Sequence, residues 1–276
     1  MKHIATLTRT REILNKYGLS PKKGYGQNFI IDPGVVKKIA QASCHADLTT
    51  IEIGPGIGAL TEWLLNYSYK VIAYEIDDKL IDVLNENFGE YDNFTLINGD
   101  FLKADLSNIN DECVVCANLP YYITTPILFK LFESGIKFKS INVMMQKEVG
   151  DRLLARCNMA SYSALSVVVG HRYDVKTLMK VPKEVFNPKP KVDSIVLTLT
   201  PKKLEVDFDV LGFGEFVRNC FNYRRKTLIN NLKNFLAVEV IDELNMQFNF
   251  GQKRPQELSV EEFVEVYKSY ENTRIR

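Results

Sequence analysis

Short apolar runs alternate with amphipathic segments along the first half of the chain. Runs rich in valine and isoleucine predict buried strands, whereas apolar residues spaced three or four apart predict helices. Strands are predicted at 51–53, 70–74, 94–97, 113–117 and 141–145. Helices are predicted at 59–66, 78–87 and 126–132. Strands that alternate with helices indicate parallel pairing, so the expected fold class is α/β with a doubly wound sheet.

The pattern changes in the last third of the chain. Two further strands are predicted at 173–181 and 192–199, and prolines at 182, 188 and 190 interrupt regular structure between them. Pro201 and the charged segment 202–207 are typical of a linker. Helices are then predicted at 208–221, 226–236, 241–248 and 260–270. We therefore expect a sheet-containing domain over 1–200 and a small all-helical domain over 201–276.

Composition narrows the class of protein. The chain of 276 residues is 46% hydrophobic and 25% charged, as in soluble globular proteins. It contains no apolar run of the ~18 residues that a membrane span needs, and its first residues lack the apolar core of a secretory signal. Its five cysteines are irregularly spaced, and the lone Cys113/Cys116 pair has no second pair of ligands for zinc. We expect a cytoplasmic protein without a metal.

A glycine-rich turn between the first strand and helix predicts a cofactor site. Gly54, Gly56 and Gly58 let the backbone turn sharply and approach a ligand closely. Such a turn alone is a weak signal, and a purely structural tight turn is the alternative. The spacing departs from GxGxxG, and Pro55 removes an amide that a pyrophosphate would use. The turn therefore favours S-adenosylmethionine (SAM) over NAD.

Acidic residues follow the next two strands. Glu75 stands 21 residues after Gly54, where a carboxylate can accept both hydroxyls of a ribose. Asp100 follows the third strand and is placed to accept hydrogen bonds from an adenine amine. For either acid alone, a solvated carboxylate at a strand end is the alternative. Because ligands bind at the carboxyl ends of strands in such sheets, the three features together predict one site.

The tetrapeptide Asn118-Leu119-Pro120-Tyr121 follows the fourth strand at the same edge. The carboxamide oxygen of Asn118 and the carbonyl of Leu119 are suited to accept the two N–H groups of an exocyclic adenine amine. Two acceptors would free the nitrogen lone pair for attack on a sulfonium methyl and stabilise the developing positive charge. Pro120 stiffens the turn, and Tyr121 offers a stacking face worth ~1–3 kcal/mol per base.

A second aromatic residue and a set of basic residues complete the candidate site. Phe186 precedes the Pro188 and Pro190 loop and is either a cover for the second face of a flipped base or ordinary core. The net charge is only +1, so nucleic-acid binding requires local patches. Candidate phosphate contacts, or alternatively a solvated helix face, are Lys189, Lys191, Arg218, Arg224, Arg225 and Lys226.

These segments together resemble the small-subunit (16S) ribosomal RNA adenine dimethyltransferases, the KsgA/RsmA/Dim1 family. The resemblance runs nearly end to end, through Gly26 to Phe29, Glu52 to Leu60, 74–77, 99–100, 118–123 and 186–194. It continues through 224–228 and 254–259. The sequence departs from the family at Tyr122, where many members carry Asn.

The resemblance implies a Rossmann-like SAM-methyltransferase fold and two successive methylations on each of two adjacent adenosines. These adenosines lie in a hairpin loop near the 3′ end of 16S rRNA, and a role in ribosome biogenesis follows. It implies SAM contacts at Asn28, Ile30, Gly54, Gly56, Glu75, Asp100 and Asn118. It also implies that Tyr121 and Phe186 hold the base, and that the helical domain docks on rRNA within the small subunit or its precursor. We expect a monomer.

Other functions remain open on the sequence. The nearest is the related group that methylates large-subunit rRNA and confers macrolide resistance, which usually has Ser where Gly26 stands. A DNA adenine methyltransferase lacks support, because no sizeable target-recognition domain follows. An assembly factor that acts mainly by binding, and an NAD-dependent dehydrogenase, are the alternatives from other classes.

Overall fold

The structure is a computed structural model that describes residues 3–109, 111–120, 122–203 and 207–275, apart from 22–25. The chain divides into two compact units. The first comprises Met1–Gly150 with Lys176–Thr200, and the second comprises Asp151–Val175 with Pro201–Arg276. The second unit thus takes in residues 151–175 in addition to the segment 201–276 that the sequence assigned to the helical domain.

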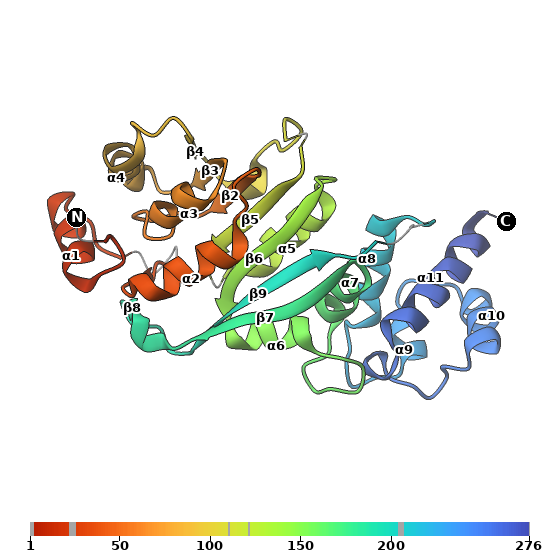
Figure 1. Cartoon of the computed structure of the whole chain (residues 1–276). Coiled ribbons are helices and arrows are strands. Elements are labelled where there is room, and N and C mark those ends of the chain that lie inside the picture. The colour runs from red at the N-terminus through yellow and green to blue at the C-terminus, as the bar shows by residue number, and fades with distance from the viewer. Residues whose placement is uncertain (1–2, 22–25, 110, 121, 204–206, 276) are drawn as a thin grey trace. The chain divides into compact units, whose positions relative to one another are not determined.

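A mixed sheet forms the centre of the first unit (Figure 1). Its order, among the described residues, is β4-β3-β2-β5-β6-β9-β7. Neighbours from β4 to β6 pair in parallel, and β6 pairs antiparallel with β9. The strands are β2 (Thr49–Ile53), β3 (Lys70–Glu75), β4 (Phe94–Asn98), β5 (Cys113–Asn118), β6 (Phe138–Gln146), β7 (Tyr173–Val181) and β9 (Ser194–Pro201). The parallel part places the carboxyl ends of β2, β3, β4 and β5 at one edge, as the sequence predicted.

Helices and short elements of the first unit pack around this sheet. They are α1 (Leu7–Lys16), α2 (Pro33–Ser43), α3 (Thr61–Tyr67), α4 (Asp78–Phe88), the 3₁₀ turn η2 (Phe101–Lys103), α5 (Thr124–Glu133) and η3 (Lys183–Val185). A separate two-residue ladder joins β1 (Phe29–Ile30) to β8 (Phe186–Asn187). Asp32 and Asp77 cap the first turns of α2 and α4. Apolar faces of α2, α3 and α4 contribute to one continuous core.

Helices make up most of the second unit. They are α7 (Ala164–Arg172), α8 (Val210–Cys220), α9 (Leu228–Leu232), α10 (Val238–Phe248), the 3₁₀ turn η4 (Pro255–Glu257) and α11 (Val260–Ile275). Helix α6 (Lys147–Leu154) begins in the first unit and ends in the second. The core of the second unit is aromatic: the rings of Phe213, Phe216 and Tyr267 pack edge to face at centroid distances of 5.4–5.5 Å. Such ring pairs add to the apolar area they bury, and give this small unit a core of its own.

Every predicted strand is present, with ends shifted by up to three residues. Predicted helices are also present, although α9 is much shorter than the predicted 226–236. Helices α1, α2, α6 and α7 lie where no element was predicted. Over the described residues, no helix is long and apolar enough to cross a membrane. The same residues contain no group of three or more His, Cys, Asp or Glu side chains that could hold a metal ion.

Candidate active site

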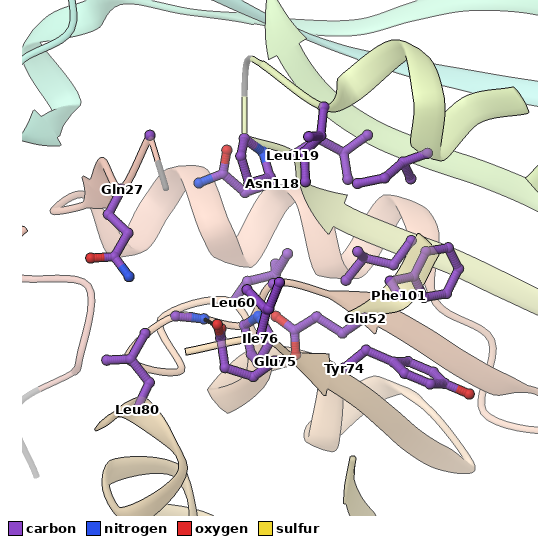
Figure 2. A pocket seen from close by; sticks show the side chains of 18 of the residues that line it. Gln27, Glu52, Leu60, Tyr74, Glu75, Ile76, Leu80, Phe101, Asn118 and Leu119 are labelled. Atoms are coloured by element: carbon purple, nitrogen blue, oxygen red, sulfur yellow. Dashed lines mark hydrogen bonds between the residues drawn. The ribbon is translucent and has the colours of Figure 1, made fainter. Parts of the chain in front are cut away.

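A cavity of ≈ 1070 Å³, open to solvent, lies at the carboxyl ends of the parallel strands. Its lining includes the candidates Asn28, Ile30, Gly54, Gly56, Glu75, Asp100, Asn118, Leu119, Pro120 and Phe186. Figure 2 shows Asn118 and Leu119 on one side of this cavity, and Glu52, Glu75 and Ile76 on the other. Tyr121 lies outside the described residues. The structure therefore brings residues as far apart in the chain as Asn28 and Phe186 into one cavity.

The glycine turn after β2 is held by the neighbouring strand end. Gly54 and Gly56 have φ of 69° and 62°, a region that residues with a Cβ rarely adopt. The Gly54 amide donates to the Tyr74 carbonyl at 2.9 Å, and the Gly56 amide donates to Glu75 Oε2 at 3.0 Å. The turn and the end of β3 thus form one rigid wall of the cavity.

Glu75 is 4% exposed and is oriented by two backbone donors. Asp77 N–H donates to its Oε1 at 2.9 Å, opposite the Gly56 contact on Oε2. Burial raises the pKa of Glu75, and these two amides oppose that shift. Each carboxylate oxygen has a second lone pair, so the pair of oxygens can still accept two hydroxyl groups from a ligand.

Asp100 begins the 3₁₀ turn η2 beside the cavity. Its Oδ1 accepts the Leu102 amide at 2.9 Å, which fixes the side chain at the N-terminus of the turn. Next to it, Phe101 is 4% exposed and packs edge-on against Tyr74, with ring centroids 5.2 Å apart. Ile76, by contrast, is 42% exposed. Apolar surfaces beside a carboxylate suit a flat ring that carries an amine.

Asn118 ends β5, and the residues after it turn into α5. Leu119 is 1% exposed and its amide donates to the Met144 carbonyl at 3.0 Å, so the chain is fixed to β6 at this point. The Pro120 carbonyl accepts from Thr124 Oγ1 at 3.0 Å and from the Ile123 amide at 3.2 Å. These contacts hold the turn in place independently of any ligand.

The ladder between β1 and β8 places two candidates directly opposite each other. Ile30 pairs in register with Phe186, and the Ile31 amide extends the contact to the Val185 carbonyl at 2.8 Å. Asn28, just before β1, donates from Nδ2 to the Gly26 carbonyl at 2.9 Å. Phe186 is 4% exposed, is part of the hydrophobic core and also lines the cavity, so the two sequence-based interpretations of this residue are compatible.

Glu52 is a site residue that the sequence argument left without a role. It is 1% exposed, lines the cavity and accepts a 2.7 Å hydrogen bond from Thr61 Oγ1 on its Oε2. Burial raises its pKa to about 8, the Thr61 contact opposes the shift, and the nearby Glu75 adds to it. The available signal was an acid between two isoleucines in a strand of a parallel sheet, because such sheets are covered on both faces. Gln27 was also missed, and its Nε2 donates to Asp77 Oδ2 at 3.0 Å.

The basic candidates differ in their surroundings. Lys189 forms an exposed ion pair with Glu184, 2.7 Å from Nζ to Oε1, and Lys191 is exposed. In the second unit Arg218, Arg225 and Lys226 are exposed. Arg224 is exposed as well, but its Nη2 donates to the carbonyls of Ala160 at 2.8 Å and Tyr162 at 2.7 Å. Within the second unit, Arg224 therefore connects the segment 151–175 to the turn between α8 and α9.

Comparison with known proteins agrees with this arrangement. The family model for ribosomal RNA adenine dimethylase matches residues 18–272. The chain belongs to the ribosomal RNA adenine dimethylase family. Family members of Bacillus thuringiensis (strain Al Hakam) and Bacillus cereus (strain B4264), each named ribosomal RNA small subunit methyltransferase A, are 46% identical over 95% of this chain and 96% of their own length.

Two solved structures have the same fold. A dimethyladenosine transferase from Plasmodium falciparum superposes with a TM-score of 0.77 at 27% identity, covering 89% of this chain and 98% of that one. The 23S rRNA methyltransferase ErmE gives 0.66 at 23% identity, covering 88% and 100%, which supports the fold alone. A Rossmann-like methyltransferase fold is thus confirmed, and membership of the dimethylase family does not favour the dehydrogenase, DNA-modifying and large-subunit alternatives.

Proposed function

We propose that this dimethylase family member uses SAM to convert two adjacent adenosines near the 3′ end of 16S rRNA to N6,N6-dimethyladenosine. The observation that carries the proposal is the placement of Asn118, Leu119 and Pro120 in the same cavity as Glu75 and Asp100. The 46% identity to small-subunit methyltransferases supports the choice of rRNA. The substrate would be the small subunit or its precursor, met by a monomer in the cytoplasm.

The residues that line the cavity fit SAM. Glu75 would hold the ribose hydroxyls through its remaining lone pairs, and the free Asp100 oxygen would accept from the adenine amine. Gly54 and Gly56 leave room for close approach of the ligand to the backbone, and Asn28, Ile30 and Asn118 would complete the site. Glu52 adds a carboxyl group to a cavity that would receive a cationic ligand. When bound, SAM supplies an electrophilic methyl group.

The chain's contribution to the reaction is to prepare the adenine amine. Its lone pair is delocalised into the ring, so the amine is a weak nucleophile. Asn118 Oδ1 and the Leu119 carbonyl would each accept one N–H, which favours a tetrahedral nitrogen and stabilises its developing positive charge. With its lone pair freed in this way, the amine would be able to accept the methyl group that SAM supplies, and its proton would pass to solvent. Tyr121 and Phe186 would hold the two faces of the flipped base.

A second methylation requires one acceptor to give way, because the monomethylated amine retains a single N–H. The Leu119 backbone is fixed by the contact of its amide with Met144 and by the anchored Pro120. Asn118 has a side chain that can rotate. We therefore infer that Leu119 supplies the fixed acceptor and that Asn118 moves aside for the first methyl group.

The test is to incubate the protein with SAM and unmethylated small subunits and to measure dimethyladenosine by mass after digestion of the rRNA. We expect dimethyladenosine at two adjacent positions near the 3′ end. Free large-subunit rRNA is the matched control substrate. Product on large-subunit rRNA with none on small subunits would contradict the proposal and favour the alternative group.

Asn118→Ala provides the matching test of the site. Loss of one preorganised polar partner of a developing charge typically costs about 10²–10³ in kcat, so we expect a loss of that order. The loss of SAM affinity should be much smaller, because Asn118 is only one of several proposed SAM contacts. Single-turnover kinetics would measure the loss and calorimetry the affinity. Dimethylation by Asn118→Ala at near the wild-type rate would remove Asn118 from the mechanism.

A further inference from the structure

Lys130 lies in the last turn of α5 and reaches a wall of the cavity that a different part of the chain forms. Its Nζ donates to the Leu102 carbonyl at 3.0 Å and to the Ala104 carbonyl at 2.8 Å. The same ammonium lies 6.0 Å from the centroid of the Phe101 ring. Lys130 is half-buried and does not line the cavity. Its contacts are therefore with the segment that contributes Phe101 and Leu102 to the cavity lining.

That segment is the turn η2, which begins at Asp100. A three-residue 3₁₀ turn has few internal hydrogen bonds and is marginal without external support. Here the Lys103 amide donates to the Asp100 carbonyl at 2.9 Å and the Ala104 amide to the Phe101 carbonyl at 3.2 Å. The two Lys130 contacts satisfy carbonyls at the end of this turn, where hydrogen bonds to a charged donor are the stronger kind.

The other end of α5 belongs to the Asn118 segment. Thr124, the first residue of the helix, donates through Oγ1 to the Pro120 carbonyl at 3.0 Å. One helix is thus anchored at its start to the turn that follows β5, and at its end to the turn that follows β4. The distance between the Asp100 carboxylate and the Asn118 segment is therefore set partly by Lys130.

We propose that Lys130 is a positioning residue that holds η2, and with it Asp100, in the orientation that recognises the adenine of the cofactor. The inference rests on the proposed function, because it takes SAM as the ligand of the cavity. Lys130 would contact no ligand atom. It would act by fixing the segment whose first side chain accepts from the adenine amine.

The experiment compares two ligands by calorimetry: S-adenosylhomocysteine and its deaminated analogue S-inosylhomocysteine, which lacks the adenine amine. The variants are Lys130→Met, which keeps the length of the side chain without its charge, and Lys130→Arg, which can still donate to two carbonyls. Lys103→Met is the matched control, since Lys103 is an exposed lysine on the same turn. Thermal melts would verify folding, and Lys130→Gln would replace Lys130→Met if the latter were unfolded.

We expect wild type to prefer the adenine ligand by roughly 10-fold, since one hydrogen bond to a charged acceptor distinguishes the two. In Lys130→Met this preference should fall to about 2-fold, while Lys130→Arg and Lys103→Met retain it. KM for SAM should rise about 5-fold, in line with the lost preference, with kcat at saturation within 2-fold.

Two results would overturn the inference about Lys130. One is an unchanged preference with unchanged affinities in Lys130→Met. The other is equal weakening of both ligands, which would indicate a purely structural role. If wild type bound neither ligand, the proposed function itself would fail.

Discussion

Glu52 is a carboxylic acid in a buried strand; it is 1% exposed and accepts a hydrogen bond from Thr61. Transfer of a carboxylate to such a place is costly, so the group keeps its proton until the pH approaches its raised pKa of about 8. Near neutral pH the folded protein therefore holds a proton here that the unfolded chain does not. A cationic ligand in the cavity would favour its release.

The stability of the protein should consequently depend on pH through this residue. Below the ordinary glutamate pKa of 4.5 both states are protonated, and between 4.5 and about 8 only the folded state is. Unfolding then releases a proton, so the contribution to stability is lost as pH rises through that window. Glu52→Gln, which stays neutral, should gain stability relative to wild type between pH 5 and pH 8, by up to roughly 4 kcal/mol.

Thermal melts of both proteins across this range would measure the difference in Tm. Glu62→Gln is the control, because Glu62 is partly exposed and its carboxylate only joins α3 to His3 and Ile4. Parallel Tm profiles for wild type and Glu52→Gln would show that Glu52 is ionised in the folded protein.

The positions of site residues at strand ends could be predicted from the sequence, because the carboxyl ends of parallel strands meet at one edge of the sheet. Asp100 and Asn118 are examples, and both line the cavity. Lys130 and Gln27 were not predictable. Their partners lie 26 to 50 positions away, and only the folded chain brings a lysine to the carbonyls of η2 or a glutamine to Asp77.

Among the elements, the turn from β2 to α3 is tightly constrained by packing. Gly58 has φ of +90°, and a Cβ there would lie 2.3 Å from Phe88 Cε2, far inside van der Waals contact. Phe88 is 3% exposed at the end of α4, so its ring has little room to move. The third glycine of the turn is thus required by the approach of α4.

Gly58→Ala should destabilise the protein by about 3 kcal/mol or more, since it combines backbone strain with overpacking. Gly99→Ala is the matched control: a Cβ there would meet nothing within 4 Å, and its effect on stability should stay within about 0.5 kcal/mol. Urea unfolding of the two variants provides the comparison. Equal loss of stability in both would contradict the packing argument.

Uniform burial did not prevent the prediction of strands, since β5 was predicted from its apolar run, but it did prevent the prediction of helix α7. Helix α7 contains Leu165 to Val169 in succession, all of them buried, so no helical period appears in its sequence. Helix α2 did carry a start signal, since Asp32 caps it and Pro33 occupies its first position. The two-residue ladder of β1 and β8 is too short to leave any pattern.

At the scale of the whole molecule, the near-zero net charge means that rRNA binding would depend on where the cations lie. In the second unit Arg225, Lys226 and Lys233 are exposed, whereas Arg224 is engaged with two backbone carbonyls. A variant that removes Arg224 together with its neighbours would confuse loss of RNA contacts with loss of structure.

The triple variant Arg225→Ala, Lys226→Ala, Lys233→Ala should therefore weaken binding to small subunits and leave Tm unchanged. If all three contact phosphates, the slope of log K against log salt should decrease by roughly 2–3, at 0.7–0.9 per phosphate contact. Arg224→Ala is the comparison, and it should lower Tm. Unchanged affinity and slope in the triple variant would place rRNA docking elsewhere on the protein.

The ladder that pairs Ile30 with Phe186 has a consequence for the course of repeated turnover. Strand β1, which is proposed to contact the cofactor, is paired with β8, which is proposed to hold the base. A displacement of one strand would therefore displace the other. Spent cofactor must be exchanged before a second methyl group can be added. We expect that exchange of the cofactor also loosens the contact of Phe186 with the base, so that the RNA dissociates between methylations. The enzyme would then be distributive, and monomethyladenosine would accumulate before dimethyladenosine appears.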